Sequence, residues 1–145
     1  MDAPGRDESM QEQPTPMNAA EESIIVNAPV AQVYEQWLRF EDLAKFIKAF
    51  RNVKRIDDTH FSFTSVVDGK ELDSVIEVVR QIPERRIAWR TISERVGLGV
   101  VSFEPRSDDT TEVTLKLRSV FDPSMSAQNA GDYLLNFKRL IEQEP

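Results

Sequence analysis

The spacing of apolar residues changes twice along this chain, from a helical period to a strand period and back again. Residues 112–121 alternate strictly, with Val113, Leu115 and Leu117 on one face and polar side chains on the other. Such alternation is typical of an antiparallel sheet with one buried face. After Ser126, which can cap a helix, apolar residues recur three and four positions apart over about 16 residues. We therefore expect a sheet whose apolar face is covered by a closing helix.

Short turns separate a series of strands in the middle of the chain. Asp68-Gly69 fits a two-residue type I′ hairpin turn, and Pro83-Glu84 marks the next turn. A β-branched run at residues 23–26 predicts one more strand near the start. Period-2 alternation predicts strands at residues 60–68, 72–82, 86–93, 97–104 and 112–121.

Residues 30–50 contain no glycine or proline, yet their pattern predicts two helices rather than one. An apolar stripe with helical spacing covers residues 30–38. Its continuation would fall on charged positions, while residues 43–50 carry a second stripe in a different phase. We therefore expect a bend at residues 39–41.

Composition limits the class of protein. A chain of 145 residues suits one domain. Residues 1–22 hold six acidic groups and one basic group, three prolines and no aromatic residue, so we expect a disordered acidic tail there and a folded domain at 23–145. The folded part is nearly neutral, which argues against DNA binding. With no signal peptide, no membrane span and no cysteine, we expect a cytoplasmic protein without stable membrane insertion.

Five stretches, in this order, resemble a known family: IIVNAPVAQVYEQW, FEDLAKFI, LDSVIEVV, IPERRIAWRT and GVVSFEP. Over roughly residues 23–142 the chain resembles the polyketide cyclase/dehydrase branch of the START-like (SRPBCC) superfamily. The resemblance implies an α+β helix-grip fold, in which a curved antiparallel sheet of about seven strands wraps around the C-terminal helix. Two short helices would follow the first strand, and a cavity would lie between sheet and helix. Members of the superfamily carry lipids, polyketides, quinones and plant hormones.

Strand parity and helix phase select the side chains that could line such a cavity. The apolar and aromatic candidates either fill the core or form an apolar pocket, and the polar ones could orient a ligand. Arg80 would need an anionic partner if buried, but its place beside Pro83 at a strand end favours exposure. The candidate ligand-binding residues are Tyr34, Phe61, Phe63, Ser65, Ser74, Ile76, Arg80, Trp89, Thr91, Phe103, Phe121, Tyr133 and Phe137.

Several common chemistries find no support in the sequence. His60 is the only histidine, so a zinc site would depend on carboxylates alone, and an exposed turn position is the simpler interpretation. The acidic pairs at residues 57–58 and 108–109 lack EF-hand spacing. The segment 97–99 lacks a dinucleotide fingerprint. We therefore expect no metal, no cofactor and no nucleophilic triad.

Three functions remain as hypotheses. We favour binding or transport of a small hydrophobic, lipid- or polyketide-like ligand without chemistry. A polyketide aromatase/cyclase or dehydratase is less favoured, because no histidine or carboxylate occupies a clearly inward position. An interaction protein could use a basic strip within Lys45–Arg55, formed by Lys45, Lys48, Arg51, Lys54 and Arg55. A cavity of several hundred Å³ would favour a ligand, and a filled core would favour a surface role. The sequence leaves a homodimer open.

Overall fold

A computed structural model describes residues 18–47, 50–67, 69–92, 97–119 and 127–143. Its elements follow the predicted order of strand, helices, strands and closing helix. They are β1 (Asn18–Val26), α1 (Val30–Leu38), the 3₁₀-helix η2 (Phe40–Lys45), β2 (Phe50–Arg55), β3 (His60–Val67), β4 (Lys70–Ile82), β5 (Arg86–Ile92), β6 (Gly97–Ser107), β7 (Thr110–Ser119) and α2 (Ala127–Glu142).

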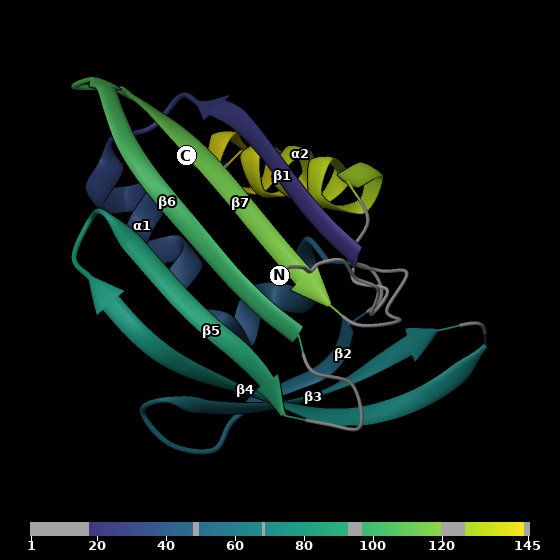
Figure 1. Cartoon of the computed structure of the whole chain (residues 1–145). Helices are drawn as coiled ribbons and strands as arrows, with labels where there is room; N and C mark the ends of the chain where they lie inside the picture. The colour runs from purple at the N-terminus through teal and green to yellow at the C-terminus, as the bar shows by residue number, and fades with distance from the viewer. Residues whose placement is uncertain (1–17, 48–49, 68, 93–96, 120–126, 144–145) are drawn as a thin grey trace, which may run out of the picture.

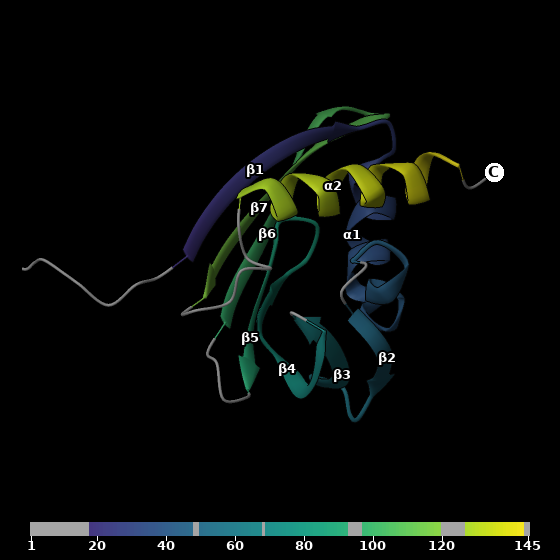
Figure 2. The ribbon, with the colours of Figure 1, turned by 90° about the vertical axis from the view of Figure 1, so that its right-hand side faces the viewer.

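One seven-stranded sheet, in the order β1-β7-β6-β5-β4-β3-β2, forms the framework, and every neighbouring pair is antiparallel. The sheet is strongly curved (Figure 1). In Figure 2, α2 runs across the concave side beside β1 and β7, and α1 stands opposite the sheet. The structure thus confirms the predicted α+β helix-grip fold, with short helices after the first strand.

The alternation of side chains also matches the prediction, because successive strand residues point to opposite faces. Phe61 and Phe63 on β3, and Ile87 and Trp89 on β5, are buried on the concave side. The largest fully buried side chains of the core are Trp37, Phe40, Phe46, Phe61 and Phe137.

β1 corrects the predicted boundary of the N-terminal tail. The strand begins at Asn18, so residues 18–22, which were assigned to the tail, belong to the folded domain and pair with β7. Ala20 is buried while Glu21 is exposed. Backbone pairing at a sheet edge tolerates acidic side chains on the solvent face, and composition alone cannot detect this. The tail prediction for residues 1–17 lies outside the described residues.

The predicted bend between the two short helices lies at Arg39, whose φ of −79° and ψ of 72° end α1. The second helix is shorter than expected, because η2 ends at Lys45 and Phe50 already begins β2. α2 has the expected 16 residues. The predicted capping residue, Ser126, lies outside the described part of the chain.

Polar contacts from the C-terminal half of α2 hold it against the rest of the domain. Asn136 donates to the backbone carbonyl of Phe46 over 3.2 Å, and Lys138 donates to that of Ile25 over 2.8 Å. Glu142 accepts a hydrogen bond from the backbone N–H of Asn27 over 2.8 Å. These contacts link the closing helix to β1, to the turn after it and to the segment after η2.

Glu142 makes the stability of the domain depend on pH. The hydrogen bond from Lys138, followed by that from the Asn27 amide, lowers the pKa of Glu142 below its ordinary value of 4.5. A carboxyl with a lowered pKa stabilises the folded state above that ordinary value, and the contribution is lost as pH falls through the folded-state pKa. We expect Glu142→Gln to lower the free energy of unfolding at pH 7 by about 1 kcal/mol. Urea unfolding at pH 7 and pH 3 should show a smaller difference from the wild type at the lower pH, and an equal difference at both would contradict this role.

The turn between β4 and β5 stores backbone strain. Arg85 donates its backbone N–H to the carbonyl of Ile82 over 2.9 Å, and Glu84 has a φ of 59°. Left-handed backbone is unfavourable for residues with a Cβ, but not for glycine. We expect Glu84→Gly to raise the free energy of unfolding by about 0.5–1 kcal/mol, as measured in urea. Glu84→Ala keeps the Cβ and should give no such gain; an equal gain in both variants would assign the effect to the lost charge.

Candidate ligand cavity

A small cavity lies between the concave face of the sheet and the three helices, with a volume of about 30 Å³. That is room for one or two water molecules. The sheet contributes residues from β2, β4, β5 and β7, and the helical side contributes residues from α1, η2, α2 and the segment after η2. The lining residues are Trp37, Phe40, Leu43, Ile47, Phe50, Ile76, Trp89, Thr91, Leu115, Leu117 and Tyr133.

Aromatic rings define the walls of the cavity. The ring centroid of Trp37 lies 4.7 Å from that of Phe137, 5.4 Å from that of Phe46 and 6.1 Å from that of Trp89. Phe40 stacks on Phe61 at 5.0 Å and meets Trp89 edge-on at 5.8 Å. Aromatic contacts at these distances stabilise the pairs beyond simple burial. These ring contacts between helices and strands fix the positions of the aromatic side chains around the cavity.

Trp89 depends on the glycine opposite it. Trp89 pairs with Gly99 on β6, and its indole lies directly over that glycine. A Cβ at position 99 would come within 2.2 Å of the indole ring. Gly99 is thus required because the ring and the neighbouring strand approach each other so closely.

Four of the predicted ligand-binding residues line this cavity: Ile76, Trp89, Thr91 and Tyr133. Five others are buried on the same side of the sheet but do not line it, namely Phe61, Phe63, Ser74, Phe103 and Phe137. Ser65 is half-buried. Phe121 lies outside the described residues.

Tyr34 is buried on α1 and meets Phe103 edge-on, with 5.6 Å between ring centroids. Burial, assisted by the negative charge of Glu84, raises the pKa of the Tyr34 hydroxyl. The phenol is therefore neutral at physiological pH. Tyr34 does not line the cavity, so the structure gives it a packing role beside β6.

Arg80 does not reach the cavity. The β4–β5 register shifts between Val78 and Arg80, which leaves both Val79 and Arg80 exposed. A bulge of this kind ends the in-out alternation that had placed Arg80 on the inner face. The idea of an inward Arg80 that pairs with an anionic ligand is therefore corrected.

The sequence interpretation missed seven lining residues. Trp37 belongs to the stripe predicted for the first helix, and Leu115 and Leu117 belong to one face of the strand predicted at residues 112–121, but none of the three was named as a ligand-binding candidate. Their patterns show burial and cannot distinguish a cavity wall from filled packing. The other missed residues are Phe40, Leu43, Ile47 and Phe50.

One polar group in this wall has no protein partner. Trp37 is 1% exposed, and its indole N–H is the buried side-chain group that finds no acceptor among the described residues. Buried donors are normally paired, and leaving one unmet is costly. Trp89, Thr91 and Tyr133 are the other lining residues that carry a polar side-chain group.

The chemistry available in the cavity is limited. None of the lining residues within the described part of the chain is a histidine, a carboxylate or an amine. General acid–base catalysis usually depends on such groups. The described wall therefore offers mainly apolar contact.

Two larger hollows, of about 740 and 440 Å³, lie outside the core. The larger is lined by Arg85, Arg86, Glu104 and Glu112, among others, and Glu112 pairs with Arg106. The smaller includes Lys54 and Asp73. Both are open and carry charged groups, so neither resembles an apolar ligand pocket.

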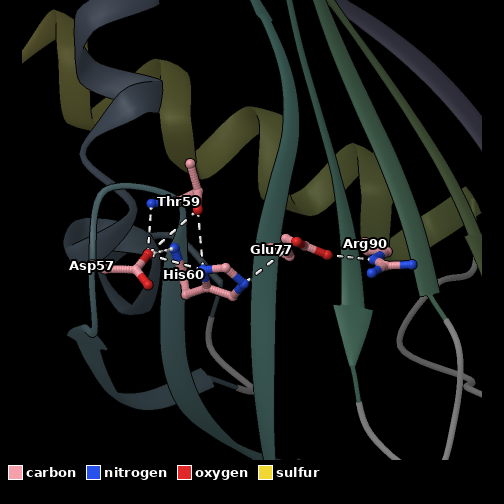
Figure 3. A network of polar contacts seen from close by, with 5 residues as sticks. All are labelled: Asp57, Thr59, His60, Glu77 and Arg90. Carbon is pink, nitrogen blue, oxygen red and sulfur yellow. Dashed lines mark hydrogen bonds and ion pairs between the residues drawn. The ribbon is translucent and has the colours of Figure 1, made fainter.

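Figure 3 shows a polar network on the solvent side of β3, β4 and β5. Asp57 accepts hydrogen bonds from the backbone N–H groups of Thr59 and His60 over 2.9 and 2.8 Å, and these bonds, together with the His60 ring, lower its pKa. His60 lies between Asp57 and Glu77, with 2.9 Å to one carboxylate and 3.4 Å to the other. Glu77 also pairs with Arg90.

This network joins a turn to the sheet and shows no sign of a reaction centre. The two ring nitrogens of His60 face different carboxylates, so the groups do not converge on one point. Among the residues that the structure describes, no group of three or more His, Cys, Asp or Glu side chains could hold a metal ion. His60 itself begins β3 and is 31% exposed at its side chain.

Part of the predicted basic strip is already paired. Lys45 contacts Asp42 at 3.4 Å, and Arg55 donates to Glu41 over 3.0 Å while lying over the ring of Phe61. Arg51 and Lys54 are exposed, and Lys48 lies outside the described residues. Surface pairs of this kind contribute little to stability but reduce the charge that a partner would meet.

The helices within the described ranges are all too short or too polar to cross a membrane.

These features define a helix-grip protein with a small apolar cavity under its closing helix. A family model described as "Polyketide cyclase / dehydrase and lipid transport" matches residues 26–139. The chain belongs to this family, as its sequence predicted.

Individual proteins and solved structures are similar to this chain in sequence or in fold. An uncharacterised 17.2 kDa protein of Streptomyces lincolnensis is 35% identical over 124 residues, which cover 85% of this chain and 81% of the relative. A crystal structure of a Deinococcus radiodurans protein matches with a TM-score of 0.72 and 25% identity, covering 86% of this chain and 98% of that one. The Zhui aromatase/cyclase of a Streptomyces strain shares the fold, with a TM-score of 0.71 at 15% identity, covering 88% of this chain and 94% of that one.

Proposed function

We propose that this protein binds a small hydrophobic molecule in the cavity between the sheet and α2, and does so without catalysing a reaction. The observation that carries the proposal is the composition of the wall, where nine of eleven lining residues are apolar. Ligand pockets are typically apolar with a few polar groups that set orientation. Lipid transport in the description of the family is consistent with such a site.

Ligand binding requires this cavity to widen. A volume of about 30 Å³ is far below the several hundred Å³ of typical ligand pockets, so cavity volume alone favours a surface role, and ligand binding depends on a wider form of this cavity. Four of the lining residues belong to the short segment of η2 and the residues that follow it, up to the start of β2. Movement of this segment away from the sheet would enlarge the cavity without breaking the long strand ladders, and a ligand can shift the population toward such an open form.

Aromatase/cyclase activity is a second candidate, favoured by the structural similarity to the Zhui aromatase/cyclase. It is weaker because the described cavity wall offers no histidine or carboxylate to move protons. An interaction role for the basic strip is also weaker, since Lys45 and Arg55 are paired with acidic neighbours.

Native mass spectrometry of the protein purified from cells tests the proposal. We expect a bound small molecule on the wild type and its loss in Leu115→Phe, because the larger side chain fills the cavity. Val113→Leu is the matched control, since Val113 is buried on the same face of β7 but does not line the cavity. Absence of any bound molecule, or equal retention by both variants, would contradict binding at this site.

A further inference from the structure

The indole N–H of Trp37 affects which ligands this cavity can bind favourably. Trp37 lines the cavity, is 1% exposed, and has no acceptor among the described residues. Its close neighbours are the rings of Phe46, Trp89 and Phe137, and the phenylalanine side chains offer no oxygen or nitrogen. These neighbouring rings can offer the donor only weak contacts with their π faces.

Such a donor favours a ligand that brings its own acceptor. A buried hydrogen bond that forms stabilises a complex modestly, whereas a buried donor left unmet costs considerably more. A pure hydrocarbon would leave the Trp37 N–H unmet, while a ligand oxygen next to the ring would pair with it. Because the lining residues that the structure describes include no cationic side chain, a neutral acceptor suits the site better than a carboxylate.

We propose that the cavity selects small apolar molecules that carry a neutral hydrogen-bond acceptor, such as a ketone oxygen, and that Trp37 is the residue that recognises this acceptor. The inference rests on the proposed ligand binding. It adds a class of ligand and a specificity-determining residue, because apolar contact alone would not distinguish a ketone from a hydrocarbon of the same shape.

Two probes of nearly equal shape can separate recognition from hydrophobicity. Acetophenone and α-methylstyrene differ only in that a C=O group replaces a C=CH₂ group. Water solvates the ketone better than the hydrocarbon. The ratio of their dissociation constants in one protein therefore reflects both this difference in solvation and any hydrogen bond to Trp37. The change in that ratio between wild type and variant isolates the contribution of the protein.

Trp37→Phe removes the N–H and keeps an aromatic ring. We expect this variant to shift the ratio of dissociation constants about tenfold against acetophenone. Trp89→Phe is the matched control, because Trp89 lines the same cavity and is the only other tryptophan of the chain. Trp89→Phe should weaken the binding of both probes to a similar extent. The ratio of their dissociation constants should stay within about twofold of the wild-type ratio.

A spectroscopic readout on the wild-type protein covers the case in which Trp37→Phe does not fold. Two tryptophans produce two indole N–H signals in a ¹H–¹⁵N spectrum, and the spectrum of Trp89→Phe assigns them. Acetophenone should move the Trp37 signal downfield, while α-methylstyrene should not, since only the ketone accepts a hydrogen bond.

The outcomes distinguish the two proposals. If neither probe binds the wild type, ligand binding in this cavity is itself contradicted. If both probes bind but the ratio stays within twofold in Trp37→Phe, or the Trp37 signal moves equally with both probes, recognition through Trp37 is overturned while ligand binding stands. A water molecule retained on the Trp37 N–H would produce this second result.

Discussion

Phe137→Ala should lower the free energy of unfolding by about 3–5 kcal/mol. Phe137 is fully buried on α2, with its ring 4.7 Å from that of Trp37 and 5.3 Å from that of Phe46. Truncation removes apolar burial and leaves a hole where the closing helix meets the helical side of the core. Urea unfolding followed by tryptophan fluorescence measures the loss.

Leu135→Ala is the matched control on the same helix. Leu135 is 39% exposed, so its truncation should cost less than about 1 kcal/mol. Similar losses for the two variants would mean that α2 is not seated with Phe137 in the core. Every assignment of a cavity under the helix would then need revision.

Gly99→Ala should lower the free energy of unfolding by about 2–3 kcal/mol or more. The new methyl group would lie 2.2 Å from the Trp89 ring, so the indole must leave its place over β6. The displaced ring lines the cavity, so the change should also alter the fluorescence of the folded protein and weaken the binding of apolar probes. Thermal and urea unfolding, together with fluorescence spectra, provide the measurements.

Gly131→Ala is the matched glycine control. A Cβ at position 131, within α2, would meet nothing within 4 Å. Alanine is a better helix former than glycine, so the free energy of unfolding of this variant should rise by about 0.5–1 kcal/mol. If the free energy of unfolding falls in Gly99→Ala and rises in Gly131→Ala, then close packing at Gly99, and not the general effect of an added methyl group, causes the destabilisation. Stabilisation of both variants would contradict the close approach of Trp89 to β6.

The two glycines illustrate what a sequence can and cannot disclose. Both lie within segments of clear pattern, Gly99 in a predicted strand and Gly131 in a predicted helix. Their roles differ because of what lies beside them in space. Trp89 faces Gly99 only because β5 pairs with β6 in the observed register, and no local rule specifies that pairing.

The candidate site was predictable where it depends on the alternation of strand side chains between the two faces of the sheet. Ile76, Trp89 and Thr91 were selected as inward-facing, and they line the cavity because alternation along a strand survives folding unchanged. Parity alone would have placed Arg80 inward, but a bulge just before it reverses the parity. The position of Arg80 beside Pro83 had favoured exposure, which the structure confirms. A bulge depends on how two strands fit, so periodicity within one strand cannot reveal it.

Periodicity by itself determined that this protein has a one-sided antiparallel sheet, two short helices and a closing amphipathic helix, because each pattern reflects local backbone geometry. Only the tertiary structure decided that the cavity is about 30 Å³, that Trp37 and the residues of η2 form one wall, and that an indole N–H finds no acceptor among the residues that the structure describes. These properties depend on how side chains from separate elements fill a shared volume. Burial patterns are the same for a filled core and for the wall of a cavity, so only the packed structure distinguishes them.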